Sequence, residues 1–491
     1  MEQQRFSFQQ RSLRLSLAAL GIVFVFGLVL LVSQTILISL NPIIGLGTVA
    51  FIILIALLVI RSEFALCAYI LLAGPTVTIP VSDSGILSRL YPGDLIFMVL
   101  VGLWFLEELS NKSKTRVELR NKRILVPFVC LALIGLASII ASHLSPDPHV
   151  AYAFLHSDIS LTLVNAVEMF LLISLPLFII VVPGLVRTPK DARRMIGAYL
   201  LVGLPYALGT IFAGPLHLYS QDVILGIQRP EVFGTSSSNL GLLNVLFACL
   251  ALCQTIYAKK ETTRLAFGLM TCIFAGGVVM AFGRESWIGL LLAVWLILLL
   301  RFKSPFALLL PFIILPILLL FVPGIANFFD PTKVYGADRI TIWQDAITIW
   351  QHSPYLGVGA GNFQFFDITY GTEVVGVAHN QLLEVLAEMG VQGLVCLVVA
   401  IILIGRVAFE RFNSAKSDTG KVISLAYLGY FAALLFASFF ADPFVPSTSA
   451  GGGTAPLIFI SYLWIFLGLV LSIPNWDKEA TASHNMPVQR M

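Results

Sequence analysis

The chain has 491 residues, of which 58% are hydrophobic and only 12% are charged, and its formal net charge is +3. Soluble globular proteins carry about 25% charged residues. This composition therefore excludes a soluble enzyme, a nucleic-acid-binding protein and a disordered scaffold. It predicts a protein whose main solvent is lipid.

Long apolar runs follow one another along most of the chain. A helix that crosses the hydrocarbon core needs about 20 apolar residues, and the runs predict about 12 to 14 transmembrane helices. We expect an all-α polytopic membrane protein with one long extracytoplasmic loop, 324–390, that carries short amphipathic helices. The predicted spans lie near 15–33, 42–60, 64–80, 93–109, 124–142, 162–183, 195–213, 238–257, 264–282, 286–300, 304–323, 391–409, 422–441 and 455–473.

The distribution of basic residues predicts the orientation. With both termini in the cytoplasm, all but five of the 30 Lys and Arg residues fall on the cytoplasmic side. Positive charge is disfavoured on the outer side, so a Lys or Arg residue kept there indicates a functional role. The planar guanidinium group of arginine suits the binding of a pyrophosphate. For two of the five, Arg89 and Lys333, contact with lipid headgroups is an equally good explanation. The five exceptions are Arg89, Arg229, Arg284, Lys333 and Arg339.

The long outer loop contains a predicted amphipathic helix at 338–351. Ile340, Trp343, Ile347 and Trp350 recur at helical spacing and therefore share one face. Two tryptophans on an apolar face are typical of a helix that lies in the lipid headgroup layer.

Three alternating glycines, Gly357, Gly359 and Gly361, follow this helix. Glycines allow backbone N–H groups to approach an oxyanion or a sugar closely, so this run is a candidate substrate-binding segment. A plain connecting loop explains the same pattern.

His379 stands where the outer loop enters a helix that leads into the membrane. Asn380, Glu384 and Glu388 follow at intervals of four residues and form one polar stripe on that helix. The ordinary pKa of histidine, about 6.5, suits a general base near neutral pH. A solvated or capping histidine is the alternative.

Four motifs resemble those of the O-antigen ligase and polymerase superfamily. At two positions the chain departs from the pattern, because Leu394 stands where ligases often carry Thr and Gly283 where Ser is common. The motifs are His379-Asn380 with Gly390 and Gly393 after nine intervening residues, Arg339 and Trp343 followed by Pro354, Gly357, Gly359, Gly361 and Phe363, FGRESWIGLLLA at 282–293, and Arg229 followed by Gly234 and Asn239.

The resemblance is firm over about 225–410 and implies a domain organisation. Transmembrane helices would fill 1–224, an O-antigen ligase-related domain would cover 225–410 with its outer loop 324–390, and further transmembrane helices would fill 411–473. Residues 474–491 would form a cytoplasmic tail. The architecture implied is that of a GT-C-like enzyme.

The activity implied is metal-independent glycosyl transfer in cell-surface polysaccharide assembly, such as lipopolysaccharide or exopolysaccharide. The enzyme would move a glycan from undecaprenyl pyrophosphate to a hydroxyl of a glycan, lipid or protein acceptor. It would work at the outer face of the bacterial cytoplasmic membrane, with no cofactor, metal or nucleic acid.

The resemblance also implies roles for individual residues. Arg284 and Arg339 would neutralise the leaving pyrophosphate, and His379 would take the proton of the acceptor hydroxyl. Asn380 or Glu384 would orient the imidazole. The residues expected to contact the substrate are Arg229, Asn380, Glu384, Gly357, Gly359 and Gly361.

A membrane transporter for a small anion such as bicarbonate is the alternative from another functional class. Transporters bind their solute near the bilayer midplane with buried charges and broken helices, whereas only Glu168 lies clearly inside a predicted span. Among enzymes, the sequence leaves ligase, polymerase and protein transferase open.

Overall fold

The protein is described by a computed structural model that covers residues 64–75, 91–110, 119–150, 161–224, 227–303, 336–372, 376–445 and 455–477. The predicted spans 15–33, 42–60 and 304–323 lie outside these residues, as do Arg89 and Lys333. In the described part, nine helices are long and apolar enough to cross a membrane, and a shorter apolar helix covers Pro92–Phe105. The chain is therefore a mainly helical, multi-pass membrane protein.

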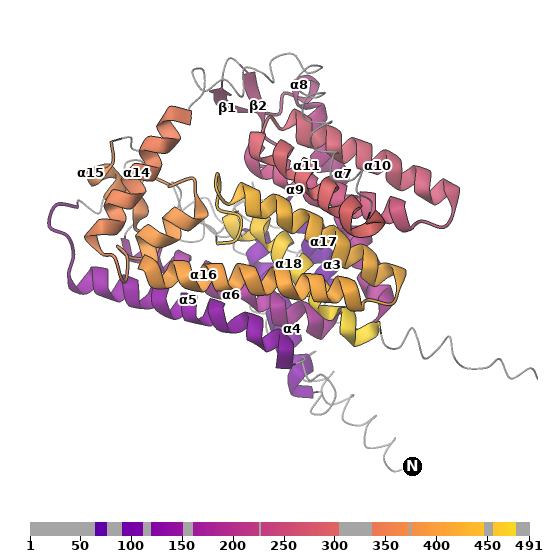
Figure 1. Ribbon diagram of the computed structural model, residues 1–491, viewed down its shortest axis with the longest axis horizontal. Helices are drawn as coiled ribbons and strands as arrows, with labels where there is room; N and C mark the ends of the chain where they lie inside the picture. Colours follow the sequence, from indigo (N-terminus) through magenta and orange to yellow (C-terminus); the bar gives the residue numbers. More distant parts are fainter. Residues whose placement is uncertain are drawn as a thin grey trace, which may run out of the picture.

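Most described helices follow the predicted spans, and α9 packs against α10, α11 and α17 (Figure 1). The predicted span 64–80 is an exception, because α3 has eight residues and is too short to cross a membrane. Helix α16 begins at Gln381, ten residues before the predicted span 391–409. The helices are α3 (Ala65–Leu72), α4 (Pro92–Ser110), α5 (Leu119–Leu144), α6 (Leu161–Leu185), α7 (Pro189–Ile211), α8 (Ala213–Leu216), α9 (Ser237–Tyr257), α10 (Glu261–Met280), α11 (Arg284–Phe302), α14 (Gly336–His352), α15 (Phe363–Tyr370), α16 (Gln381–Ser414), α17 (Asp418–Ala437) and α18 (Ala455–Trp476).

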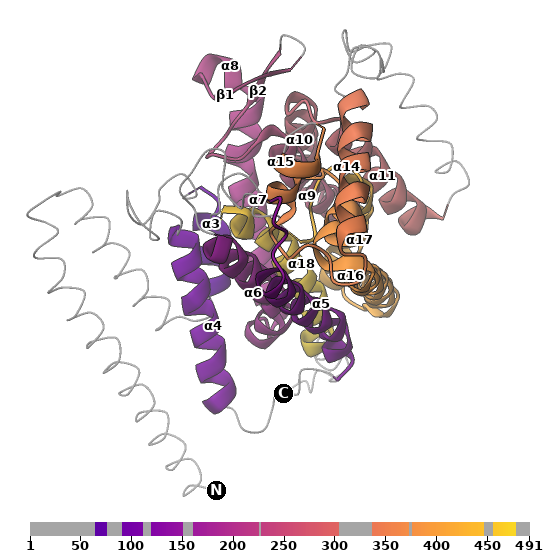
Figure 2. The same ribbon diagram turned by 90° about the vertical axis from the view of Figure 1, so that its left-hand side faces the viewer.

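A small β-hairpin departs from the expected all-α architecture. Strands β1 (Tyr219–Ile224) and β2 (Ile227–Pro230) pair antiparallel between α8 and α9. A two-stranded hairpin is marginal by itself and depends on what it packs against, which explains why the sequence pattern did not indicate it. In Figures 1 and 2 the hairpin and α14 lie at the same, upper end of the molecule.

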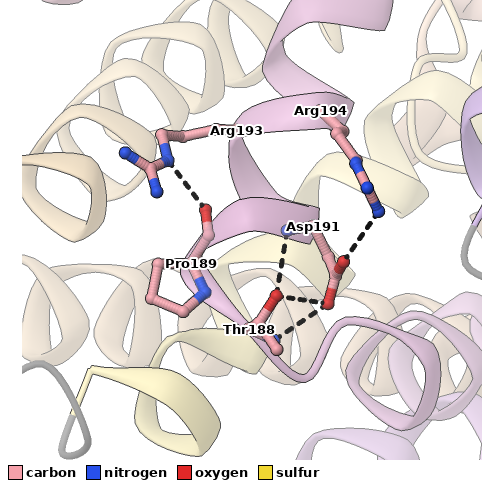
Figure 3. Close-up of polar contacts among 5 residues, drawn as sticks. All are labelled: Thr188, Pro189, Asp191, Arg193 and Arg194. Atoms are coloured by element: carbon pink, nitrogen blue, oxygen red, sulfur yellow. Dashed lines mark hydrogen bonds and ion pairs between the residues drawn. The ribbon is translucent and has the colours of Figure 1, made fainter.

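Helix α7 begins with a capping box, and two arginines follow in its first turns (Figure 3). The Thr188 hydroxyl accepts from the Asp191 N–H at 3.2 Å, and the Asp191 carboxylate accepts from the Thr188 N–H at 3.0 Å. Arg194 lies 3.4 Å from the same carboxylate, and Arg193 donates to the Pro189 carbonyl. The acidic cap offsets the cost of two arginines near the positive end of the helix dipole.

Other basic residues gather at the same end of the helices as the start of α7. Lys259, just after α9, lies 3.0 Å from Asp418, at the start of α17. Arg229 precedes the start of α9, and Arg284 begins α11. Both therefore lie at the other end of these helices from Lys259. The two groups of basic residues therefore lie at opposite ends of the helical bundle.

The predicted amphipathic helix at 338–351 is confirmed as α14, but the face that packs on the protein differs from the predicted stripe. Ile342, Ala346 and Ile349 are buried, whereas Ile340 and Ile347 are 57% and 40% exposed. The buried face joins a small cluster with α15 and the Gly-rich loop. The predicted stripe is therefore a second, more exposed apolar side of the helix, of which Ile340 and Trp343 lie beside Arg284 and Phe440.

The N–H groups of the three alternating glycines donate to protein groups, and their contact with a substrate stays a prediction. Gly357 donates to the Ser353 carbonyl at 2.8 Å and Gly359 to the Glu388 carbonyl at 3.0 Å. The Gly361 N–H donates to the carboxylate of Glu388. A Cβ on Gly357 would overlap the backbone of Glu388. The run is glycine because it lies directly on another backbone.

The same loop is held from the membrane side by polar side chains of α5 and α6. Asn165 donates to the Asn362 side chain at 2.7 Å and to the Ala360 carbonyl at 2.8 Å. Asn362 in turn donates to Ser142 at 3.1 Å, and Ser138 accepts from the Ala360 N–H. Buried polar networks of this kind rigidify a segment when every member is satisfied. The loop is thus a fixed support between α14 and α15.

Helix α16 is interrupted at Gly390, whose φ of 68° is left-handed. Replacing Gly390 with alanine is expected to destabilise the fold by at least about 2 kcal/mol, because the new Cβ would be strained and would overlap the Tyr355 carbonyl. Thermal unfolding of the purified protein in detergent measures the loss. Gly197→Ala is the control, since no atom lies within 4 Å of its Cβ position. An equal effect of both substitutions would contradict the explanation.

Candidate functional site

The turn before α11 sets the position of Arg284. Phe282 adopts a left-handed φ of 54°, and the Ser286 hydroxyl donates to the Gly283 carbonyl at 2.7 Å. The indole N–H of Trp287 donates to the Val278 carbonyl at 3.0 Å and so ties α11 back to α10. Arg284 therefore leaves a fixed turn at the first position of a helix, where the dipole favours an anion.

Arg229 is bound to the same turn. Its Nη2 donates to the Phe282 carbonyl at 3.0 Å. It lies in β2, which the sequence analysis had not expected to be a strand. The hairpin therefore brings this arginine from a distant part of the chain to the start of α11.

Arg339, in the first turns of α14, approaches from the other side. Its Nη1 donates to the Phe440 carbonyl at 3.4 Å, and its guanidinium carbon lies 5.4 Å from the centre of the Phe440 ring. Phe440 belongs to the turn that follows α17. Arg339 is thus held by a backbone carbonyl and an aromatic face, neither of which neutralises its charge.

The site carries an excess of positive charge. Burial lowers the pKa of Arg339, Glu285 raises it in part, and Arg229 lowers it further. Glu285 is 93% buried beside Arg284, at a relative exposure of 7%. Among the described residues, Glu285 is the carboxylate whose charge acts on Arg284 and Arg339, and the three arginines Arg229, Arg284 and Arg339 leave the cluster with the electrostatics of an anion site.

A cavity of about 260 Å³ opens beside the arginines. The rings of Trp343 and Phe440 lie 6.2 Å apart on its wall. Charged groups together with aromatic and aliphatic side chains on one cavity wall suit an amphiphile. The cavity is lined by Arg284, Glu285, Ile288, Arg339, Ile340, Trp343, Phe436 and Phe440.

His379 lies close enough to this cluster for the charges of Arg339 and Glu285 to act on it. It is half-buried, with a left-handed φ of 47°. Burial, followed by Arg339, lowers the pKa of His379 to about 4, against the opposing effect of Glu285. The imidazole is therefore neutral at physiological pH and able to accept a proton.

Asn380 and Glu384 hold the backbone on both sides of His379. The Asn380 side chain caps α16 by accepting from Leu382 and Leu383 at 3.1 and 3.2 Å. The Glu384 carboxylate accepts from the Ala378 N–H at 3.1 Å. Both contacts fix the chain that carries the imidazole, so they are positioning contacts in the described structure.

Gln381 is a positioning residue that the sequence analysis did not single out. Its backbone N–H donates to Ser438, and its side chain accepts from Phe444 and Val445 and donates to Val445. The turn 438–445 also provides the Phe440 carbonyl that holds Arg339. One turn therefore fixes His379 and Arg339 relative to each other. The only signal in the sequence was a polar residue at the start of a predicted helix. The partners of Gln381 are distant in sequence, so this signal did not indicate them.

Asp442 lies in that turn and was also not predicted. Burial raises the pKa of Asp442 well above its usual range, as do Glu384, Glu168 and a hydrogen bond with Glu384. A carboxyl that keeps its proton can donate this hydrogen bond. The pair therefore fastens the turn 438–445 to the start of α16.

The structure thus brings Arg229, Arg284, Arg339 and His379 together and assigns the glycines to a supporting loop. In comparison with known families, residues 269–398 match a family described as O-antigen ligase. This segment contains Arg284, Arg339, His379 and the Gly-rich loop, and Arg229 precedes it. A comparison with curated proteins finds no match.

Proposed function

We propose, because residues 269–398 belong to the O-antigen ligase-related family, that the chain transfers a glycan from a lipid pyrophosphate to an acceptor hydroxyl. The family indicates a glycan-transferring enzyme of the O-antigen ligase or polymerase type. The finer proposal is an undecaprenyl pyrophosphate donor and a GT-C-type enzyme of the bacterial cytoplasmic membrane. The observation that carries it is the excess positive charge of Arg229, Arg284 and Arg339 beside an apolar cavity.

The cavity beside the arginines matches the lipid side of such a donor. The pyrophosphate would bind Arg284 and Arg339, and the first isoprene units would lie along Trp343, Phe436 and Phe440. Planar guanidinium groups bind phosphate oxygens in pairs. They also supply the positive charge that a leaving pyrophosphate needs, so the proposed reaction requires no metal.

The proposed reaction is a single displacement at the anomeric carbon of the donor. The acceptor oxygen forms a bond to this carbon as the bond to the pyrophosphate oxygen breaks. The electron pair leaves with the pyrophosphate, whose charge Arg284 and Arg339 balance. The proton of the acceptor hydroxyl passes to the neutral imidazole of His379 and then to water.

The proposed site faces the outer side of the membrane. The supporting observation is that the arginine cluster lies at the opposite end of the bundle from Arg193, Arg194 and Lys259. Lys and Arg are enriched in cytoplasmic loops, so that other end is the expected cytoplasmic side. A small-anion transporter, the alternative from the sequence, has no support in the family match.

The proposal predicts that a strain without this protein accumulates glycan on undecaprenyl pyrophosphate and loses the corresponding surface glycan. Wild type should restore the surface glycan, and His379→Ala should not. Mass spectrometry of extracted lipids and surface material measures both. His149→Ala, an exposed histidine outside the cluster, is the control and should rescue fully.

The same experiment separates the two enzyme types. Long stranded chains on the carrier lipid would indicate a ligase, and single repeat units would indicate a polymerase. Unchanged glycans in the strain without the protein would refute the proposed function.

A further inference from the structure

A second cavity, of about 470 Å³, lies beside the β-hairpin and is separate from the apolar cavity at the arginines. It is bordered by the end of α7, by α8, by the two strands and by the end of α10 with the turn after it. Its volume falls within the range of about 300–1,000 Å³ that is typical of ligand pockets. The proposed contacts of the pyrophosphate and the isoprene chain involve none of the residues that line this cavity.

The wall of this cavity has the chemistry of a sugar site. Gln228 provides an amide and Tyr219 a phenol hydroxyl, and both groups can donate and accept hydrogen bonds. The Thr210 hydroxyl is buried and donates to the Tyr206 carbonyl at 2.7 Å. Ile211, Ala213, Pro230 and Met280 complete the wall with apolar groups. Tyr219, 40% exposed, and Phe282 provide aromatic faces for the apolar side of a sugar ring. None of the described residues that line it is charged, in contrast to the cavity beside Arg284 and Arg339. A neutral, polyhydroxylated ligand fits this wall better than an anion or a lipid chain.

The two cavities meet at one segment of backbone. Phe282 lines the hairpin cavity, and Arg284, two residues later, lines the apolar cavity. Arg229 connects them, because its neighbour Gln228 lines the hairpin cavity and its own guanidinium donates to the Phe282 carbonyl at 3.0 Å. The order across the site is therefore the aromatic wall of Trp343, Phe436 and Phe440, then the arginines, then the uncharged hairpin cavity.

We infer that the hairpin cavity binds the saccharide of the donor, on the far side of the pyrophosphate from the lipid. This inference rests on the proposed function. A lipid-linked glycan has the same three parts in the same order: a hydrocarbon chain, a pyrophosphate and a sugar. The β-hairpin then acts as the part of the enzyme that recognises the glycan, and its residues determine which donor is accepted.

The test compares two lipids on the full-length protein in nanodiscs. The first probe is the lipid-linked glycan extracted from the strain that lacks the protein, and the second is undecaprenyl pyrophosphate without glycan. Wild type should bind the first more tightly. Tyr219→Leu and Gln228→Leu should each weaken binding of the first probe about fivefold or more. Neither should change binding of the second, which also shows that the variants are folded.

Tyr355→Leu is the matched control, because Tyr355 is 75% exposed and lines neither cavity. It should bind both lipids as wild type does. Equal affinity of wild type for the two lipids, or hairpin variants that bind the glycan-bearing lipid normally, would overturn the inference. So would hairpin variants that raise only the KM for the acceptor, because the cavity would then hold the acceptor.

Failure of this inference can be told apart from failure of the proposed function. If the strain without the protein accumulates no lipid-linked glycan, the proposed function fails and no first probe is obtained. If it accumulates that glycan and wild type transfers it, but the hairpin variants behave as wild type in binding, only the assignment of the cavity fails.

Discussion

His379→Asn is expected to lower the rate of glycan transfer by about 100-fold to 10,000-fold, the usual contribution of a general base. Asparagine is chosen because His379 has a left-handed φ of 47°, a conformation that asparagine tolerates better than alanine does. The fold should therefore persist while the proton acceptor is lost. The rate is measured with membranes of the strain that lacks the protein, supplied with the purified variant. A variant that keeps more than a tenth of wild-type activity would contradict the role of base.

The pH dependence of the wild type gives an independent check on the same residue. Burial, followed by Arg339, lowers the pKa of His379 to about 4, so the imidazole stays neutral as the pH falls through its ordinary value. A base acts in its neutral form. The value of kcat/KM is therefore expected to stay level from pH 7 to about 5 and to fall only near pH 4. A fall centred near pH 6.5 would mean that the catalytic base is an unburied histidine.

Arg284→Lys and Arg339→Lys are each expected to lower kcat about 100-fold to 1,000-fold. Lysine keeps the charge but loses the planar pair of donors that holds two phosphate oxygens. Because the leaving group gains charge only as the bond breaks, the loss should appear in kcat more than in KM. The assay is the membrane transfer reaction with lipid-linked glycan as donor.

Arg406→Lys is the control for these two substitutions. Arg406 pairs with Glu410 at 3.2 Å on an exposed helix surface, with 71% of its side chain exposed. Exposed pairs contribute little to stability, so activity should not change. If Arg284→Lys and Arg339→Lys behaved like this control, the arginine cluster would not be the pyrophosphate site.

Asn380, Glu384 and the glycines have structural contacts that the motif did not indicate, and their roles toward a substrate stay predictions. The spacing from His379 to Gly390 indicated a functional segment, and His379 does lie at the arginine cluster. The N–H groups of Gly357, Gly359 and Gly361, however, bind Ser353 and Glu388. Sequence spacing shows that a tight turn is present, but it does not show which group the turn faces.

The transmembrane helices followed from the sequence alone, because each must bury about 20 apolar residues in lipid whatever its neighbours are. The outward position of Arg229, Arg284 and Arg339 followed from the bias of basic residues along the chain and stays a prediction. Helix α14 also followed from local periodicity. These features depend on residues close in sequence and on the surrounding lipid or water. Composition and residue spacing therefore suffice to predict them.

The tertiary structure alone decided which of these features meet. The β-hairpin that carries Arg229 to the Phe282 carbonyl is stabilised by packing and has no strong local signal. Gln381 holds the turn 438–445, more than 50 residues away in sequence, and that turn holds Arg339. Glu285 is buried within the cluster and leaves it with excess positive charge. Contacts between distant segments arise only when the helices pack, so no pattern along the chain could have specified them.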